Sequence, residues 1–168
     1  MIIVLNGPLG IGKSTLAEAL TESIDACAML SGDHLVAVNP QSKNELEHFH
    51  STIELLVLHH RRFGYRNFVI EHVWRSEWEL TDLKRRFDDP HVHCFLLTLP
   101  IEENLRRIER RQAARAIDEH EFEHRTLAEE RRALEGPQLG TPFDVSAPPP
   151  ELVLRLLALV GQSWLPGR

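Results

Sequence analysis

The residues with the most recognisable chemistry are a lysine and a serine that follow a run of glycines. The segment 7–15 reads Gly-Pro-Leu-Gly-Ile-Gly-Lys-Ser-Thr and matches the pattern G-x-x-x-x-G-K-S. Glycines let backbone N–H groups converge on a phosphate because no Cβ stands in the way. Lys13 can then reach the β- and γ-phosphates of a nucleotide, while the Ser14 hydroxyl can bind Mg²⁺. The nucleotide is therefore expected on Gly7, Gly10, Ile11, Gly12, Lys13, Ser14 and Thr15.

Two carboxylates follow apolar runs further along the chain. Asp33 comes directly after the run 26–31, and Glu71 ends the run 67–70. Phosphoryl transfer to an alcohol needs a carboxylate that orients the hydroxyl or accepts its proton, and we expect Asp33 in that role. The alternative for Asp33 is the N-cap of a following helix. Glu71 is costly at a buried strand end unless it is exposed, bound to a metal's water shell or paired with Arg75.

Three arginines form the next candidate group. Arg107, Arg111 and Arg115 are four residues apart, so they share one face of a helix. Arginine stacks on aromatic rings and stabilises negative charge, which suits both a nucleotide base and a transferring phosphoryl group. We expect Arg111 and Arg115 to stabilise the transferring group. The alternative is a solvated helix face interspersed with Glu109 and Glu119.

Strands and helices alternate around these residues. Apolar runs predict strands at 2–5, 26–31, 67–70, 91–99 and 143–145, and the intervening patterns predict helices at 13–23, 45–62, 76–87 and 151–160. A further helix after Pro100 should carry Ile101, Leu105 and Ile108 on one face. The highly charged segment 115–132 is expected to be an exposed and mobile helical excursion.

This alternation predicts an α/β fold. A parallel sheet of five strands would be covered by helices on both faces, as a three-layer α/β/α sandwich in one domain over residues 1–168. Ligands of such sheets bind beyond the carboxyl ends of the strands, where the phosphate loop, Asp33 and Glu71 all fall. A mobile helical lid is expected at about residues 112–132.

The composition limits the functional classes. The net charge of −6 argues against a general nucleic-acid or membrane binder. The two cysteines fall in apolar runs, which is typical of small buried side chains in a reducing compartment. No apolar run approaches membrane-spanning length and the chain starts directly on a strand, so a cytoplasmic protein is expected, either monomer or homodimer.

Four segments resemble the small P-loop kinases of the nucleoside-monophosphate kinase, shikimate kinase and gluconate kinase group. They are the phosphate loop, the segment 30–33, the segment 69–75 and the segment 107–111. The second resembles the strand-two Asp segment of gluconate, adenylylsulfate and chloramphenicol kinases, where that Asp handles the substrate hydroxyl. The third is similar to the apolar-Asp-Gly-Phe-Pro-Arg segment of the monophosphate kinases, without its Gly and Pro. The fourth resembles the Arg-x-x-x-Arg at the start of their lid.

This resemblance implies a P-loop NTPase fold and a kinase that moves the γ-phosphoryl group of ATP to a hydroxyl of a small molecule. It implies that Arg107 packs on the adenine and that Arg111 reaches the phosphates. By the same resemblance, Asp33, Glu71 and Arg75 contact the acceptor substrate. The segments 1–7 and 93–99 also resemble, more weakly, tunicamycin-resistance-type ATP-binding proteins.

Two alternatives remain at the level of sequence. One is a nucleotide-gated binding or antibiotic-resistance module that sequesters a ligand without phosphorylating it. The other is a nucleic-acid end kinase, which the acidic balance disfavours. The acceptor pocket of this group is built from the segment corresponding to residues 35–64. Its basic residues favour an anionic or polar acceptor, or else form a solvated face; they are His48, His50, His59, Arg61 and Arg62.

Overall fold

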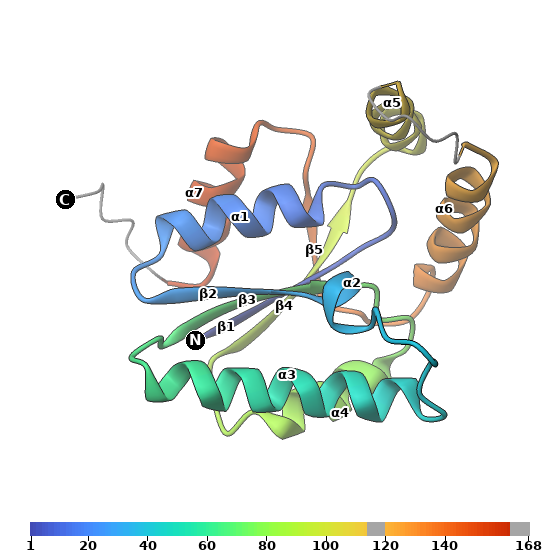
Figure 1. Cartoon of the computed structure of the whole chain (residues 1–168). Helices are drawn as coiled ribbons and strands as arrows, with labels where there is room; N and C mark the ends of the chain where they lie inside the picture. Colours follow the sequence, from blue (N-terminus) through green and yellow to red (C-terminus); the bar gives the residue numbers. More distant parts are fainter. Residues whose placement is uncertain (114–119, 162–168) are drawn as a thin grey trace.

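The computed structural model describes residues 1–113 and 120–161 (Figure 1). Its strands are β1 (Ile2–Asn6), β2 (Cys27–Ser31), β3 (Asn67–His72), β4 (Val92–Thr98) and β5 (Thr141–Asp144). Its helices are α1 (Lys13–Ser23), α2 (Gly32–Leu35), α3 (Glu45–Arg62), α4 (Glu77–Arg86), α5 (Ile101–Gln112), α6 (His120–Leu134) and α7 (Pro149–Leu159). In these ranges no helix is both long and apolar enough to cross a membrane.

The five strands form one parallel sheet in the order β2-β3-β1-β4-β5, which confirms the predicted fold class. β3 lies between β1 and β2, so that Glu71 pairs in register with Leu5 on one side and Ser31 on the other. The carboxyl ends of the first three strands therefore meet at one edge of the sheet. That edge carries the phosphate loop, Asp33 and Glu71.

Helices cover both faces of the sheet (Figure 1). The alternation of side chains along β1 sends Ile3 and Leu5 into a core with α1 and α7, while Ile2 and Val4 pack with α3 and α4. Each fully buried aliphatic side chain of this kind contributes roughly 1.5–3 kcal/mol to folding. A hydrophobic core on each face of the sheet therefore supports the edge that carries the site.

Two expectations for the segment 101–132 are only partly met. On α5 the buried positions are Asn104 and Ile108, whereas Ile101 is 41% exposed. Within the described part of the charged segment, α6 is packed rather than exposed, since Leu127, Glu123 and Glu130 are buried. Glu123 and Glu130 can be buried because their carboxylates accept hydrogen bonds from other parts of the chain. The many charged residues of the segment therefore gave no sign that it packs against the rest of the protein.

Candidate active site

The phosphate loop connects β1 to the N-terminus of α1. Gly10 (φ 73°) and Gly12 (φ 104°) have left-handed backbone conformations that favour glycine. A Cβ on Gly10 would lie only 2.4 Å from Ile108 Cγ1 of α5. The loop therefore requires glycine at position 10 for both its conformation and its contact with α5.

Lys13 lies at the centre of this loop. Its ammonium group donates to the carbonyl oxygens of Gly7, at 2.9 Å, and Pro8, at 3.2 Å. Burial lowers the pKa of Lys13, and the nearby carboxylates of Glu71, Glu130 and Asp33 oppose that shift. The surrounding carboxylates thus favour the charged form of an amine held beside the loop's backbone.

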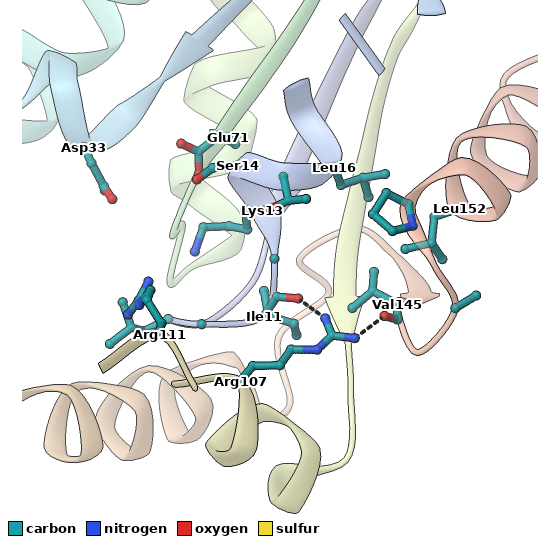
Figure 2. Close-up of a pocket in the computed structure, with 16 residues that line it drawn as sticks. Ile11, Lys13, Ser14, Leu16, Asp33, Glu71, Arg107, Arg111, Val145 and Leu152 are labelled. Carbon is teal, nitrogen blue, oxygen red and sulfur yellow. Dashed lines mark hydrogen bonds between the residues drawn. The ribbon is translucent and has the colours of Figure 1, made fainter. Parts of the chain in front are cut away.

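Side chains from α5 and α6 brace the loop from outside. Asn104 Nδ2 donates to the Leu9 carbonyl oxygen at 3.0 Å, and Glu130 Oε2 accepts the Leu9 N–H at 2.6 Å. Arg107 donates to the carbonyl oxygens of Ile11, at 2.8 Å, and Val145, at 2.9 Å (Figure 2). Arg107 therefore joins the loop to the segment after β5, a contact that the sequence did not predict.

A cavity of ≈ 530 Å³ opens over the loop. Figure 2 shows charged side chains at one end, including Lys13, Asp33, Glu71 and Arg111, and apolar ones at the other, including Val145 and Leu152. Arg107 lies on the wall between them. The cavity has the size of a small-ligand site and separates an anion-binding end from an apolar end. Of the predicted nucleotide-binding residues, only Gly7 does not line it.

Glu71 is 1% exposed and is held by β2. Ser31 Oγ donates to Glu71 Oε1 at 2.6 Å, and the carboxylate lines the same cavity as Ser14. The alternative of an ion pair with Arg75 is wrong, because Arg75 pairs with Glu130 at 3.8 Å. A hydroxyl and a carboxylate beside a phosphate loop are the hard oxygen donors that Mg²⁺ prefers, so the residues present fit that ion.

Asp33 lies in the first turn of α2. Ser31 is the N-cap of that helix, so the N-cap alternative for Asp33 is wrong. Its carboxylate is 79% exposed and lies 3.8 Å from His72 Nδ1. The interaction with His72 lowers the pKa of Asp33, and Lys13 adds to the shift. A Cβ on Gly32 would lie 2.4 Å from His72 Nδ1, so a glycine at position 32 leaves room for the imidazole beside Asp33.

A second cavity of ≈ 440 Å³ lies on the other side of Asp33, which lines both cavities. It is formed by the segment between α2 and α3, the start of α3, and the residues after β3. Three rings form part of its wall: the ring centroids of Phe49 and His72 are 4.4 Å apart, and those of His72 and Trp74 are 5.4 Å apart. Asp33 is thus the boundary between a loop that suits phosphate and a ring-walled cavity.

Trp74 is held in this wall on both its backbone and its indole. Asn6, the last residue of β1, donates to the Trp74 carbonyl oxygen at 2.9 Å and accepts the Trp74 N–H at 3.0 Å. The indole Nε1 donates to His50 Nε2 at 3.0 Å, and His50 Nδ1 lies 2.8 Å from Asp82 Oδ2. Because the indole can only donate, His50 Nε2 accepts and the His50 proton is on Nδ1.

The His50 imidazole is therefore neutral. Its burial lowers its pKa, against the opposing effect of Asp82. His50 thus lies beneath the wall and does not face a ligand. Of the other basic residues in the segment 35–64, His48 lines the second cavity, Arg61 pairs with Asp89, and His59 and Arg62 line a separate surface hollow. Of the five basic residues that were expected to favour an anionic or polar acceptor, or else to form a solvated face, only His48 lines the second cavity.

The remaining predicted site residues have different surroundings. Arg111 lines the first cavity and pairs with Glu123 of α6. Arg75 lines the second cavity with its side chain 60% exposed. Arg115 lies outside the described residues. Asn104, Glu130, Asn6 and His72 support the site but were not predicted; only Asn6, directly before the glycine motif, carried a local signal.

Comparisons with known proteins bear on the family and the fold of the chain. A family model described as an AAA domain matches residues 2–137. No curated protein sequence matches the chain significantly.

Several solved structures share the fold. The tunicamycin resistance protein of Deinococcus radiodurans has a TM-score of 0.71 and 21% identity, over 99% of this chain and 98% of that chain. A gluconokinase from Sinorhizobium meliloti has a TM-score of 0.68 and 19% identity, over 95% and 90%. A sugar kinase from Janibacter has a TM-score of 0.68 and 18% identity, over 95% and 94%.

At these identities the likeness shows the fold, and it confirms the resemblance to the small P-loop kinase group at that level. The family match covers most of the chain, including the glycine motif, β3 and α5. The chain therefore belongs to the AAA domain family and has the fold of the small P-loop kinases.

Proposed function

We propose that this protein is an ATP-dependent phosphotransferase that moves the γ-phosphoryl group of ATP to a hydroxyl of a small molecule. One observation carries the proposal: Asp33 lines both the phosphate-loop cavity and the ring-walled cavity. A carboxylate at that boundary can meet a hydroxyl on one side and a γ-phosphate on the other. Fold likeness to a gluconokinase and a sugar kinase supports this reading.

The donor side of the reaction belongs to the first cavity. The triphosphate would lie on the residues from Gly10 to Thr15, with Lys13 at its terminal phosphates. The adenine would lie between Arg107 and the apolar end formed by Val145 and Leu152. Ser14 and Glu71 would hold Mg²⁺, which when bound neutralises phosphate charge.

The acceptor side belongs to the second cavity. In the proposed reaction the acceptor oxygen bonds to the γ-phosphorus while the bond from that phosphorus to the β–γ bridging oxygen breaks. The hydroxyl proton passes to the Asp33 carboxylate, which first orients the hydroxyl. Lys13 and Arg111 stabilise charge on the transferring group, and Arg115 keeps the same proposed role on its sequence position alone.

Substitution of Asp33 tests this assignment. The protein is incubated with ATP, Mg²⁺ and a panel of sugar acids, nucleosides and antibiotics, and products heavier by one phosphoryl group are detected by mass spectrometry. With the acceptor so found, Asp33→Asn should lower kcat by roughly 10²–10⁴-fold, because a positioned proton acceptor contributes that much. Binding of ATP should be retained, since the phosphate loop is unchanged.

Asp25→Asn is the matched control, because the Asp25 side chain is 91% exposed and lies before β2, away from both cavities. An Asp33→Asn variant within a few-fold of wild type would overturn the role of Asp33. A ligand that binds the ATP-loaded protein without any gain in mass would instead favour the alternative of a sequestering resistance module. The fold likeness to a tunicamycin resistance protein makes antibiotics an essential part of the panel.

A further inference from the structure

The second cavity is lined by more negative than positive charge. Its carboxylates are Asp33, Glu45, Glu79 and Glu130, and Arg75 is its one guanidinium among the described residues. Arg75 is already paired with Glu130, at 3.8 Å. No lysine lines the cavity in that part of the chain. A ligand that enters it therefore meets net negative charge.

Three of the carboxylates have partners on the protein. Glu79 Oε2 accepts the backbone N–H groups of Arg75, at 2.6 Å, and Ser76, at 3.0 Å. Glu130 accepts the Leu9 N–H from the phosphate loop and pairs with Arg75. The pKa of Asp33 is lowered by His72 and Lys13.

The rest of the lining is apolar or aromatic. Phe49 and Trp74 lie in the wall with only 2% and 1% of their surface exposed, His72 is partly exposed, and Val36 and Val38 are 38% and 40% exposed. Exposed apolar side chains beside a ring-walled cavity suit a ligand with an apolar ring. Gln41, Ser42 and His48 add uncharged groups that can bond to ligand hydroxyls.

Building on the proposed phosphotransferase activity, we propose that the acceptor is a ring-bearing alcohol that is uncharged or carries an amine. Alcohols that carry a carboxylate or phosphate are rejected by this cavity. A second anion beside Asp33, Glu45 and Glu79 would be desolvated next to like charge, whereas an ammonium group would find partners. The cavity thus selects against anionic acceptors, which the basic residues in the segment 35–64 were expected to favour.

A matched set of probes tests this charge selection without knowledge of the natural acceptor. The probes are 4-(hydroxymethyl)benzylamine, 4-(hydroxymethyl)benzamide and 4-(hydroxymethyl)benzoate, which share a ring and an alcohol and differ in charge. Binding to the full chain is followed by NMR through the Trp74 indole N–H, assigned with Trp74→Phe. The amine and the amide should bind at least about fivefold more tightly than the benzoate.

Two charge-reversal variants separate the cavity from the charge of the whole protein. Glu45→Lys, at the cavity, should weaken the amine about fivefold and strengthen the benzoate. Glu22→Lys, on the exposed face of α1, makes the same change in net charge and should leave the ranking unchanged. Equal binding of the three probes, a preference for the benzoate, or no response of Trp74 to any probe would overturn the inference.

The two proposals fail in different ways. Loss of the proposed function would show as failure to bind ATP or to phosphorylate any alcohol, whatever the ranking of the probes. Failure of the present inference would show as phosphorylation of acidic alcohols, or as the contrary probe rankings, in a protein that still binds ATP.

Discussion

At the scale of single residues, the pair of Asp33 and His72 determines the chemistry at the boundary of the cavities. His72 Nδ1 lies 3.8 Å from Asp33 Oδ1, and its ring packs on Phe49. His72 is also the reason why position 32 needs glycine. A residue of the next strand therefore lowers the pKa of the carboxylate that meets the acceptor hydroxyl.

His72→Gln tests this pairing through the pH dependence of the reaction. A carboxyl group whose pKa is lowered stays ionised as the pH falls below its ordinary range. Without the imidazole the pKa of Asp33 rises, so protonation begins at higher pH. The acid limb of kcat/KM, which reports groups of the free enzyme, should therefore move to higher pH in His72→Gln.

His59→Gln is the control, since His59 lies on the exposed part of α3 away from Asp33. An acid limb that stays in place, or moves to lower pH, would contradict the role given to His72. The free energy of unfolding should depend on pH in the same direction. The interaction of Asp33 with His72 stabilises the folded state at pH values above the ordinary pKa of aspartate, and this contribution is lost as the pH falls through the lowered pKa.

At the scale of elements, α5 holds the phosphate loop in place. Ile108 packs closely against Gly10, Asn104 binds the Leu9 carbonyl, and Arg107 binds two carbonyls on different segments. The planar guanidinium group of arginine can donate from two nitrogens to the two carbonyl oxygens at once. A lysine has a single nitrogen and cannot span them in this geometry. The loop's shape thus depends on a helix that begins about ninety residues later.

Arg107→Lys keeps the charge but removes the bridge between Ile11 and Val145. We expect the free energy of unfolding to fall by about 1–2 kcal/mol, because charged hydrogen bonds to buried carbonyls are lost. The KM for ATP should rise roughly tenfold, since the loop and the base-binding end are no longer joined. Urea unfolding and steady-state kinetics measure the two effects.

Arg106→Lys provides the comparison, because Arg106 is 63% exposed and contacts its own helix at the surface, through Glu103 and the Glu102 carbonyl oxygen. It should change the free energy of unfolding by less than about 0.5 kcal/mol and the KM for ATP by less than about threefold. Equal effects of the two substitutions would mean that Arg107 acts through general helix stability rather than through the loop.

At the scale of the whole molecule, the sequence predicted what depends on local pattern. The glycine motif, the strands and the positions of Asp33 and Glu71 at strand ends follow from short runs of residues and from the rules for parallel sheets. Asn104 could not be predicted this way, because apolar spacing pointed to Leu105. The amide is buried because it reaches a loop carbonyl that is distant in sequence.

Long-range pairing of charges explains the other differences. Glu130 looks like a solvated residue in a charged run, yet it accepts a hydrogen bond from the phosphate loop. His50 looks like one of several basic residues, yet it is neutral and supports Trp74. Such partners are set by the packing of helices that are far apart in the chain, which periodicity does not encode.

A crystal structure with Mg²⁺ and a non-hydrolysable ATP analogue would test most directly whether phosphoryl transfer takes place between the two cavities. We expect the triphosphate on the backbone of residues 10–15, the γ-phosphate between Lys13 and Asp33, and the adenine beside Arg107. The γ-phosphate should face the cavity walled by Trp74. A nucleotide bound elsewhere, or one whose γ-phosphate points away from Asp33, would contradict phosphoryl transfer between the two cavities.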